Sequence, residues 1–186
     1  MNFSKYNFLA LLILGLFTIT ACGEDPVVEP PEEIITTLTY TLTPVSGGQN
    51  VVLNFQDLDG DGGNAPTITG GTLAANTIYQ GSIELLNESE EPAEDITAEV
   101  RELDLEHQFF FSTTVNGLEV TYTDTDANNN PLGLATSITT TDAGNGTLTV
   151  VLRHEPAKDA AGVSDGDITN AGGETDIEVT FDITVE

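Results

Sequence analysis

The sequence predicts an all-β fold: an antiparallel β-sandwich of about eight strands with one short helix. The first observation behind this prediction is that apolar and polar residues alternate with a period of two over most of the chain, which is typical of strands with one buried face. The second is composition, because threonine and valine are abundant and tryptophan is absent. Strands that each bury one face must pack as two sheets or close into a barrel.

Eight segments carry this alternation. The predicted strands cover residues 37–44, 50–57, 77–87, 107–115, 118–122, 134–138, 148–154 and 175–186. The last is the clearest, since apolar residues from Ile177 to Val185 face one side while Asp176 and its polar neighbours face water. Asn116-Gly117, between the fourth and fifth segments, predicts a two-residue hairpin turn.

One segment has the helical period instead. Ile96, Val100 and Leu103 lie at positions i, i+4 and i+7, and Pro92 suits the start of a helix. Acidic residues follow the proline, where the positive end of a helix dipole favours them. We expect a helix over residues 93–104, packed across one end of the β structure.

The stretch "LAANTIY" favours the sandwich over the barrel. Leu73, Thr77 and Tyr79 have a spacing that resembles the tyrosine corner of immunoglobulin-like and fibronectin-like domains, in which the tyrosine hydroxyl hydrogen-bonds back to the chain. Ala75 stands where proline is common in that motif. The resemblance implies an immunoglobulin/fibronectin-like sandwich. The alternative is a lipocalin-like barrel, which would enclose a ligand cavity.

Residues 1–21 have the form of a signal peptide. Lys5 is their only charge, and the apolar run 8–19 is too short to span a bilayer. The sequence "ITAC" that ends at Cys22 resembles a lipobox, the site where bacterial lipoproteins are cleaved and acylated on cysteine. Cys22 is the only cysteine, so we expect it to be lipidated and expect no intramolecular disulfide.

A short tether follows. Residues 22–33 are rich in proline and glutamate, and the eleven residues after Cys22 would span about 34 Å in a polyproline-like form. Glu24 and Asp25 resemble the export signal of surface-exposed lipoproteins of the Bacteroidota. We therefore expect residues 34–186 to form one domain, anchored to the outer membrane through acylated Cys22 and placed on the cell surface or the periplasmic face.

The mature chain as a whole resembles the small β-rich lipoproteins of the Bacteroidota. The stretches that carry this likeness are "GTLAANTIYQGSIELLNE", "EHQFFF" and "LRHEPAKDAAGVSDGDITNAGGETDIEV". The resemblance spans most of the chain and implies a location in the cell envelope. It implies no activity.

The chain is strongly acidic. From Cys22 onward, 31 acidic residues stand against Arg101, Arg153 and Lys158, a net charge of −28. This balance excludes nucleic acid and anionic membrane surfaces as partners, because both require lysine and arginine. The acids are spread along the chain, which favours a role in solubility over a role in cation capture.

One acidic cluster has the spacing of a calcium loop. Asp57, Asp59 and Asp61 alternate in "DLDGDG" and are followed by Gly62, as in the first half of such a loop. Ile68 stands where an EF-hand would place its last acid, so the alternative is a plain Asp/Gly turn between strands. Calcium is the one cofactor that this cluster suggests.

The two histidines form the second candidate site. His107 and His154 each share the parity of the apolar face of their strand, and two inward imidazoles could bind a transition metal or haem iron. If successive strands reverse direction, both lie at the end capped by the helix, and residues 57–61 lie at the other end. Glu106 and Glu155 are expected to point to the opposite face of the sheet. The alternative is two separate histidines that cap the core.

The sequence offers little support for catalysis. It has no Gly-x-Ser-x-Gly, no His-Glu-x-x-His and no thiol left free after acylation. We therefore expect a non-enzymatic binding or accessory module, with an outer-membrane receptor or another envelope protein as a candidate partner. A structural or adhesive sandwich without a small ligand is the alternative, and a hydrolase is the third.

Overall fold

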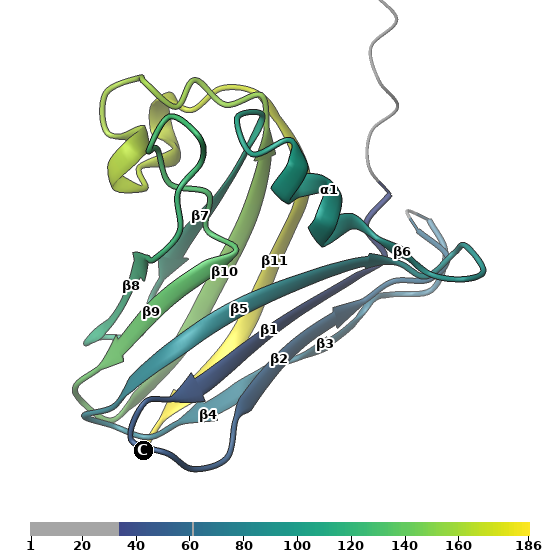
Figure 1. The fold of residues 1–186 in the computed structure, drawn as a ribbon. Coiled ribbons are helices and arrows are strands. Elements are labelled where there is room, and N and C mark those ends of the chain that lie inside the picture. Colours follow the sequence, from purple (N-terminus) through teal and green to yellow (C-terminus); the bar gives the residue numbers. More distant parts are fainter. Residues whose placement is uncertain (1–33, 61) are drawn as a thin grey trace, which may run out of the picture. The chain divides into compact units, whose positions relative to one another are not determined.

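The computed structural model describes residues 34–60 and 62–186, which form a sandwich of two β-sheets (Figure 1). The predicted signal peptide, Cys22 and the predicted tether lie outside the described residues. Within the described part, none of the helices is long and apolar enough to cross a membrane. The predicted all-β sandwich is confirmed, and the two sheets do not close into the alternative barrel.

The larger sheet is antiparallel throughout. Its strands lie in the order β3 (Thr67–Thr69), β2 (Val51–Gln56), β1 (Thr37–Pro44), β5 (Ile78–Asn87), β9 (Ala135–Thr140) and β8 (Leu118–Tyr122). A short strand, β6 (Glu94–Asp95), also pairs with the end of β5.

The smaller sheet packs against the larger one. Its strands lie in the order β4 (Gly71–Leu73), β11 (Glu174–Val185), β10 (Gly144–His154) and β7 (His107–Thr113). The pairs β11–β10 and β10–β7 are antiparallel, whereas β4 runs parallel to β11. All eight predicted strands are therefore present, and β3, β4 and β6 are additional.

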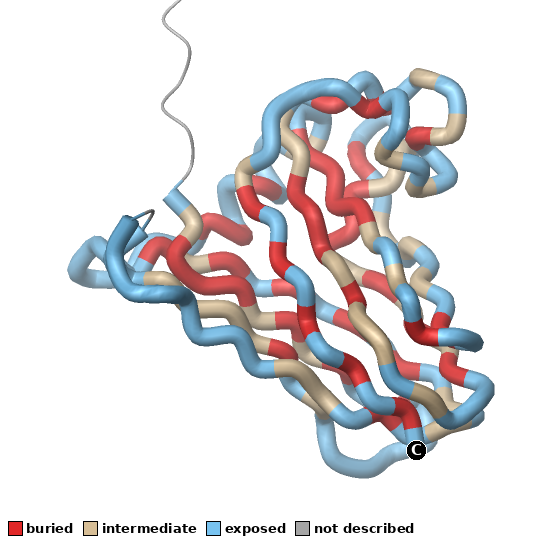
Figure 2. Tube along the Cα trace, turned by 180° about the vertical axis from the view of Figure 1, so that it is seen from behind, coloured by how far each residue is buried: buried red, intermediate tan, exposed pale blue. Residues whose placement is uncertain are grey.

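The core lies between the two sheets and follows the predicted alternation (Figure 2). Along β11, every second residue from Ile177 to Val185 is buried. Tyr40 of β1 is fully buried in the centre, where its hydroxyl lies 2.5 Å from that of Thr136 on β9. Burial raises the pKa of Tyr40, so this hydroxyl stays protonated and hydrogen-bonded inside the core.

β3 and β4 form one extended segment that changes sheets. β3 pairs with β2 in the larger sheet, and β4 pairs with β11 in the smaller one. Gly70 lies between them, where a Cβ atom would stand only 2.0 Å from the carbonyl oxygen of Asp182. The close approach of the two backbones therefore requires glycine at the crossing point.

Because of this crossing segment, β5 runs in the same direction as β2, not in the opposite direction. β2 and β5 are both antiparallel to β1, so both end at the same end of the sandwich. Asp57, directly after β2, donates its backbone N–H to Thr36, whose own N–H bonds to Leu86 near the end of β5. Leu86 pairs with Asp95, which caps the helix. The prediction that residues 57–61 lie at the end opposite the helix is therefore wrong for the described residues 57–60.

The turn at Asn116-Gly117 also differs from its prediction. Gly117 has the positive φ of 73° that such turns require. The strands on either side belong to different sheets, however, because β7 pairs with β10 and β8 pairs with β9. The predicted hairpin is therefore wrong. Asn116-Gly117 correctly indicates the local turn of the backbone, but tertiary packing decides which strands pair.

The tyrosine corner is confirmed. The backbone N–H of Ala74 donates a hydrogen bond of 2.7 Å to the hydroxyl of Tyr79. Tyr79 is 3% exposed, so its ring packs in the core while its hydroxyl holds the end of β4. The motif therefore stabilises the point where the crossing segment enters the smaller sheet.

The helix is shorter than predicted. α1 covers Ile96–Glu102, not residues 93–104, because Glu94–Asp95 pair with β5 instead of starting a helix near Pro92. The Asp95 side chain caps α1 by accepting a hydrogen bond of 3.2 Å from the N–H of Ala98. Ile96 and Val100 are buried as expected.

The chain between β10 and β11 forms a long loop beside the end of the smaller sheet (Figure 1). It contains two 3₁₀ turns, η1 (Val163–Asp165) and η2 (Ile168–Asn170). Val163 and Ala171 of this loop pack on Phe110 and Val151, which gives a second, small apolar cluster outside the main core. This loop starts immediately after His154, so it restrains the rim where that histidine lies.

Candidate metal centre

The two histidines lie side by side at the end of the smaller sheet. His107 is the first residue of β7 and His154 is the last residue of β10, and the two are direct partners in the β7–β10 register. Their imidazole rings stack with centroids 4.9 Å apart and planes 15° from parallel. Their expected proximity at the helix-bearing end is therefore found, whereas metal binding itself stays a prediction.

Asp176 of β11 joins the pair. Leu152 pairs with Ile177 and Arg153 pairs with Thr175, so Asp176 is the extra residue of a β-bulge. A bulge redirects the side chain of its extra residue, and the side chain of Asp176 is only 2% exposed. The prediction that Asp176 faces water is therefore wrong.

The three side chains converge. The Nε2 atom of His107 lies 3.9 Å from Oδ2 of Asp176, and Nδ1 of His154 lies 3.9 Å from Oδ1 of Asp176. One ligand atom from each residue lies within 4.8 Å of the other two. His107 is fully buried and the side chain of His154 is 13% exposed, so the cluster is largely closed to bulk water.

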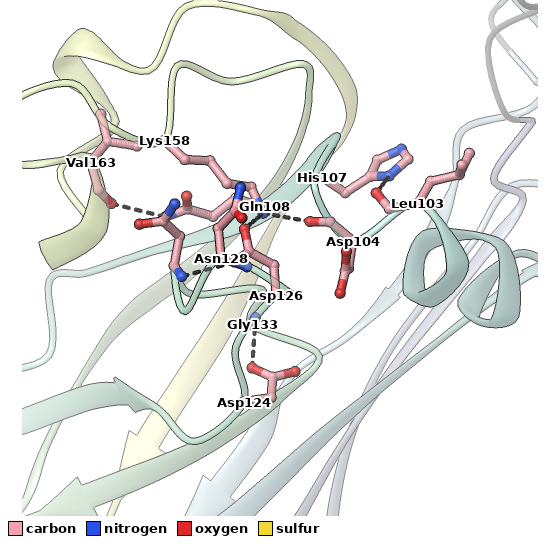
Figure 3. A network of polar contacts seen from close by, with 11 residues as sticks. Leu103, Asp104, His107, Gln108, Asp124, Asp126, Asn128, Gly133, Lys158 and Val163 are labelled. Atoms are coloured by element: carbon pink, nitrogen blue, oxygen red, sulfur yellow. Dashed lines mark hydrogen bonds and ion pairs between the residues drawn. The ribbon is translucent and has the colours of Figure 1, made fainter.

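Each ring presents its other nitrogen to an oxygen atom. The Nδ1 atom of His107 lies 3.0 Å from the backbone carbonyl of Leu103, at the end of α1 (Figure 3). A carbonyl only accepts, so Nδ1 carries a proton, and Nε2 is the nitrogen that faces Asp176. Nε2 of His154 lies 3.9 Å from Oε2 of Glu106, which leaves Nδ1 for the side of Asp176.

Glu106 therefore does not point away from the histidines as predicted. It precedes β7 and lies in the turn after α1, where its N–H bonds to the Leu103 carbonyl at 2.9 Å. Strand alternation does not govern a turn residue, and its half-exposed carboxylate reaches towards His154. Glu155 is exposed and leaves β10 with a positive φ of 49°.

The calcium candidate lies in the turn after β2. Asp57 accepts a hydrogen bond of 3.0 Å from the N–H of Gly60. Asp59 accepts from the backbone and side-chain N–H groups of Asn64, at 3.0 and 2.6 Å, and these bonds lower the pKa of Asp59. Asp61 lies outside the described residues, so calcium binding by this loop stays a prediction.

A buried ion pair close to the histidines was not predicted. The ammonium of Lys158 lies 2.9 Å from Oδ2 of Asp126 and donates to the carbonyl of Asp104 at 2.6 Å (Figure 3). Oδ1 of Asp126 accepts from the N–H groups of Asn128 and Asn130. Burial raises the pKa of Asp126, but the bonds from Lys158 and these amides outweigh burial and hold that pKa below its usual value.

This ion pair joins three connections: the turn after α1, the loop between β8 and β9, and the loop after β10. The first and last of these also carry the residues next to His107 and His154. The available signal in the sequence was the rarity of lysine, because Lys158 is the only one after Cys22. Lysine is usually exposed, and many acidic residues of this chain could pair with a single lysine at the surface. The sequence therefore does not show that Lys158 is buried or that Asp126 is its partner.

Comparisons with known proteins give no relative. No family model matches the sequence, no curated protein matches it, and no solved structure matches the fold. The chemistry of the site therefore rests on its own geometry.

Proposed function

We propose that the mature protein is a lipid-anchored protein of the outer membrane whose β-sandwich acts as a non-enzymatic binding module. The observation that carries the binding part is the convergence of His107, His154 and Asp176 at one rim of the β-sandwich. Polar side chains that meet in a buried position cost stability unless they hold something or one another. Such a group is a reason to expect a ligand.

The anchoring part of the proposal rests on the sequence. The lipobox-like "ITAC" provides Cys22 for acylation, and the tether of residues 22–33 holds the domain away from the bilayer. Glu24 and Asp25, one residue after Cys22, favour the cell surface over the periplasmic face. The strongly negative charge of the domain keeps it away from the membrane surface itself.

Binding is favoured over catalysis by the burial of the cluster. Enzymes act on substrates in concave, accessible pockets. His107 is 0% exposed and the side chain of Asp176 is 2% exposed, so an organic substrate in solution has little access to them. A small ligand that is enclosed by the protein is therefore the better fit.

A structural or adhesive role is the second candidate, and the outer face of the larger sheet favours it. Thr43, Gln80, Ser137 and Thr121 lie in one cross-strand row over β1, β5, β9 and β8. None of the four is charged, although the mature chain carries 31 acidic residues. A row of hydroxyl and amide groups suits contact with another neutral surface through hydrogen bonds.

Acyl labelling and surface exposure test the proposed function. Cells that express the wild-type chain in its native host are expected to incorporate a fatty-acid label into the protein, and the Cys22→Ser variant is expected to remain unlabelled and unprocessed. Protease added to intact cells is expected to degrade the wild-type domain. Replacement of Glu24 and Asp25 by alanine serves as the matched control, because it is expected to keep labelling but lose protease access. Normal labelling of Cys22→Ser would overturn the proposal.

A further inference from the structure

We infer that His107, His154 and Asp176 together bind one divalent transition-metal ion of the zinc class. This inference names the ligand of the binding module proposed above and rests on that proposal only for its biological setting. Its support is the geometry of three side chains from three neighbouring strands.

The donor set decides the class of metal. The cluster offers two imidazole nitrogens and one carboxylate. Calcium and magnesium are hard ions that take six or more oxygen ligands or keep their water, so two nitrogen ligands disfavour both. Imidazole suits zinc, copper, nickel and iron, and two histidines with one carboxylate form a common ligand set for zinc and ferrous iron.

The arrangement of the rings favours a single ion over haem. In haem proteins with two axial histidines, the rings approach the iron from opposite faces of the macrocycle. Here the two rings stack side by side on paired strands, with centroids 4.9 Å apart. They therefore lie on the same face of the smaller sheet and suit one ion that lies beside both of them.

The distances are close to those of an occupied site. At zinc–nitrogen bond lengths near 2.0–2.1 Å, tetrahedral ligand atoms lie about 3.3 Å apart. The three ligand atoms lie within 4.8 Å of one another, so an inward movement of about 1.5 Å brings them to that spacing. Each residue lies at a strand end or in a bulge, where side-chain rotation can supply the movement without a shift of the sheet.

The surroundings of the rings match those of metal ligands. A metal-bound histidine almost always donates its other N–H to a carbonyl or a carboxylate, which fixes the tautomer. His107 meets this condition through the Leu103 carbonyl, 3.0 Å from Nδ1. Glu106 lies at 3.9 Å from Nε2 of His154 and can serve the second ring in the same way. Both histidines therefore offer the correct nitrogen to the same carboxylate.

Electrostatics also favour a cation at this point. The Asp176 carboxylate lies 3.9 Å from a nitrogen of each ring, so its negative charge would lie beside a cation that the two rings hold. The net charge of −28 raises the concentration of cations around the domain and makes capture faster. Three protein ligands leave a fourth position on a tetrahedral ion for water or for a donor from a partner.

Metal titration tests the inference on the full mature lipoprotein purified in detergent. After treatment with chelator, the wild type is expected to bind one Zn²⁺ per chain in calorimetry, and Co²⁺ is expected to give the visible absorption of tetrahedral coordination. Ca²⁺ and Mg²⁺ in excess should not compete. Because loss of an outer-shell group costs about 10–100-fold in affinity, loss of a ligand in His154→Ala or Asp176→Asn is expected to cost about 100-fold or more.

Two control variants make the outcome decisive. Glu178→Gln removes an exposed acid two residues along β11 and should bind Zn²⁺ as the wild type does. His107→Gln changes a buried residue, so its melting temperature without metal is measured first. A melting temperature close to that of the wild type shows that the variant is folded and that any loss of binding is due to the lost ligand. A folded His107→Gln or His154→Ala variant that binds one Zn²⁺ with wild-type affinity would overturn the inference, as would a wild type that binds none.

The result is separable from the test of the anchor. A chain that is acylated and exposed on the surface but binds no Zn²⁺ would contradict the metal site and leave the lipoprotein proposal intact. A chain that binds Zn²⁺ through these residues but is never acylated would contradict the lipoprotein proposal and leave the metal site intact.

Discussion

His107 lies directly opposite His154 in the β7–β10 ladder, and their rings stack 4.9 Å apart. This relationship depends on strand register, because a slip of one residue would turn one of the rings to the other face of the sheet. The register is fixed by the apolar pairs that continue along the same two strands, Phe109 with Leu152 and Phe111 with Val150. The core therefore positions the histidines.

Glu106 is expected to tune the metal site without being essential to it. Glu106→Gln keeps the shape of the side chain but removes the carboxylate that faces Nε2 of His154. We expect one Zn²⁺ per chain still to bind, with affinity reduced about tenfold, as for other outer-shell partners of metal ligands. Calorimetry beside Glu102→Gln, a change in the last turn of α1, measures the difference. Loss of all binding in Glu106→Gln would instead make this residue a direct ligand.

How far the sequence predicts this site depends on the range of the interactions involved. The parity of His107 and His154 is a local property of two alternating strands, so their inward direction followed from the sequence. Asp176 did not, because its bulge arises from the pairing of Arg153 with Thr175 across two strands. Nothing in the alternation of residues 174–185 marks a bulge, and the same pattern in a regular strand would place this carboxylate in water.

The fold shows the same division between local and long-range information. Long alternating strands were predicted, whereas β3 and β4 contain three residues each, too few to show a period of two. The prediction assumed that each strand reverses the direction of the one before it, and β3–β4 adds one reversal between β2 and β5. Without this segment, residues 57–61 were placed at the wrong end relative to the helix. Errors in topology therefore came from short elements, and errors in the site came from cross-strand pairing.

Gly70 is expected to be intolerant of a side chain. A Cβ atom at this position would lie 2.0 Å from the Asp182 carbonyl oxygen, so Gly70→Ala must push β3–β4 away from β11. We expect the free energy of unfolding to fall by about 2 kcal/mol or more, as for overpacked cores. Gly144→Ala is the matched control, because nothing lies within 4 Å of a Cβ atom there. Equal urea midpoints for the two variants would contradict the close approach.

Calcium binding by the turn after β2 predicts a shift in melting temperature. An ion that binds only the native state stabilises it by mass action, so millimolar calcium should raise the melting temperature of the wild type. Asp59→Ala should remove this rise, since it deletes one ligand of the set Asp57, Asp59 and Asp61. Glu119→Ala, an exposed acid on β8, controls for charge. An equal rise in all three proteins would show that calcium merely screens the acidic domain.

The pair of Asp126 and Lys158 is expected to make a large contribution to stability. Both side chains are nearly inaccessible, at 0% and 6% exposure, so Asp126→Asn leaves a buried ammonium without its counter-charge. Removal of one partner of a buried pair costs about 3–5 kcal/mol. Lys158→Met should cost less, because the Asp126 carboxylate keeps the amides of Asn128 and Asn130. Urea unfolding of both variants and of the double variant measures the coupling.

The pH dependence of this pair provides an independent check. Asp126 has a pKa below its usual value in the folded protein, so its ionised form contributes stability above the unfolded pKa of about 3.9. That contribution is lost as the pH falls through the lower, folded pKa, because the native state then takes up the proton as well. The difference in unfolding free energy between wild type and Asp126→Asn should therefore be constant near neutral pH and shrink below about pH 4. A difference that stays constant into strong acid would mean that the Asp126 carboxylate is not the source of the stability.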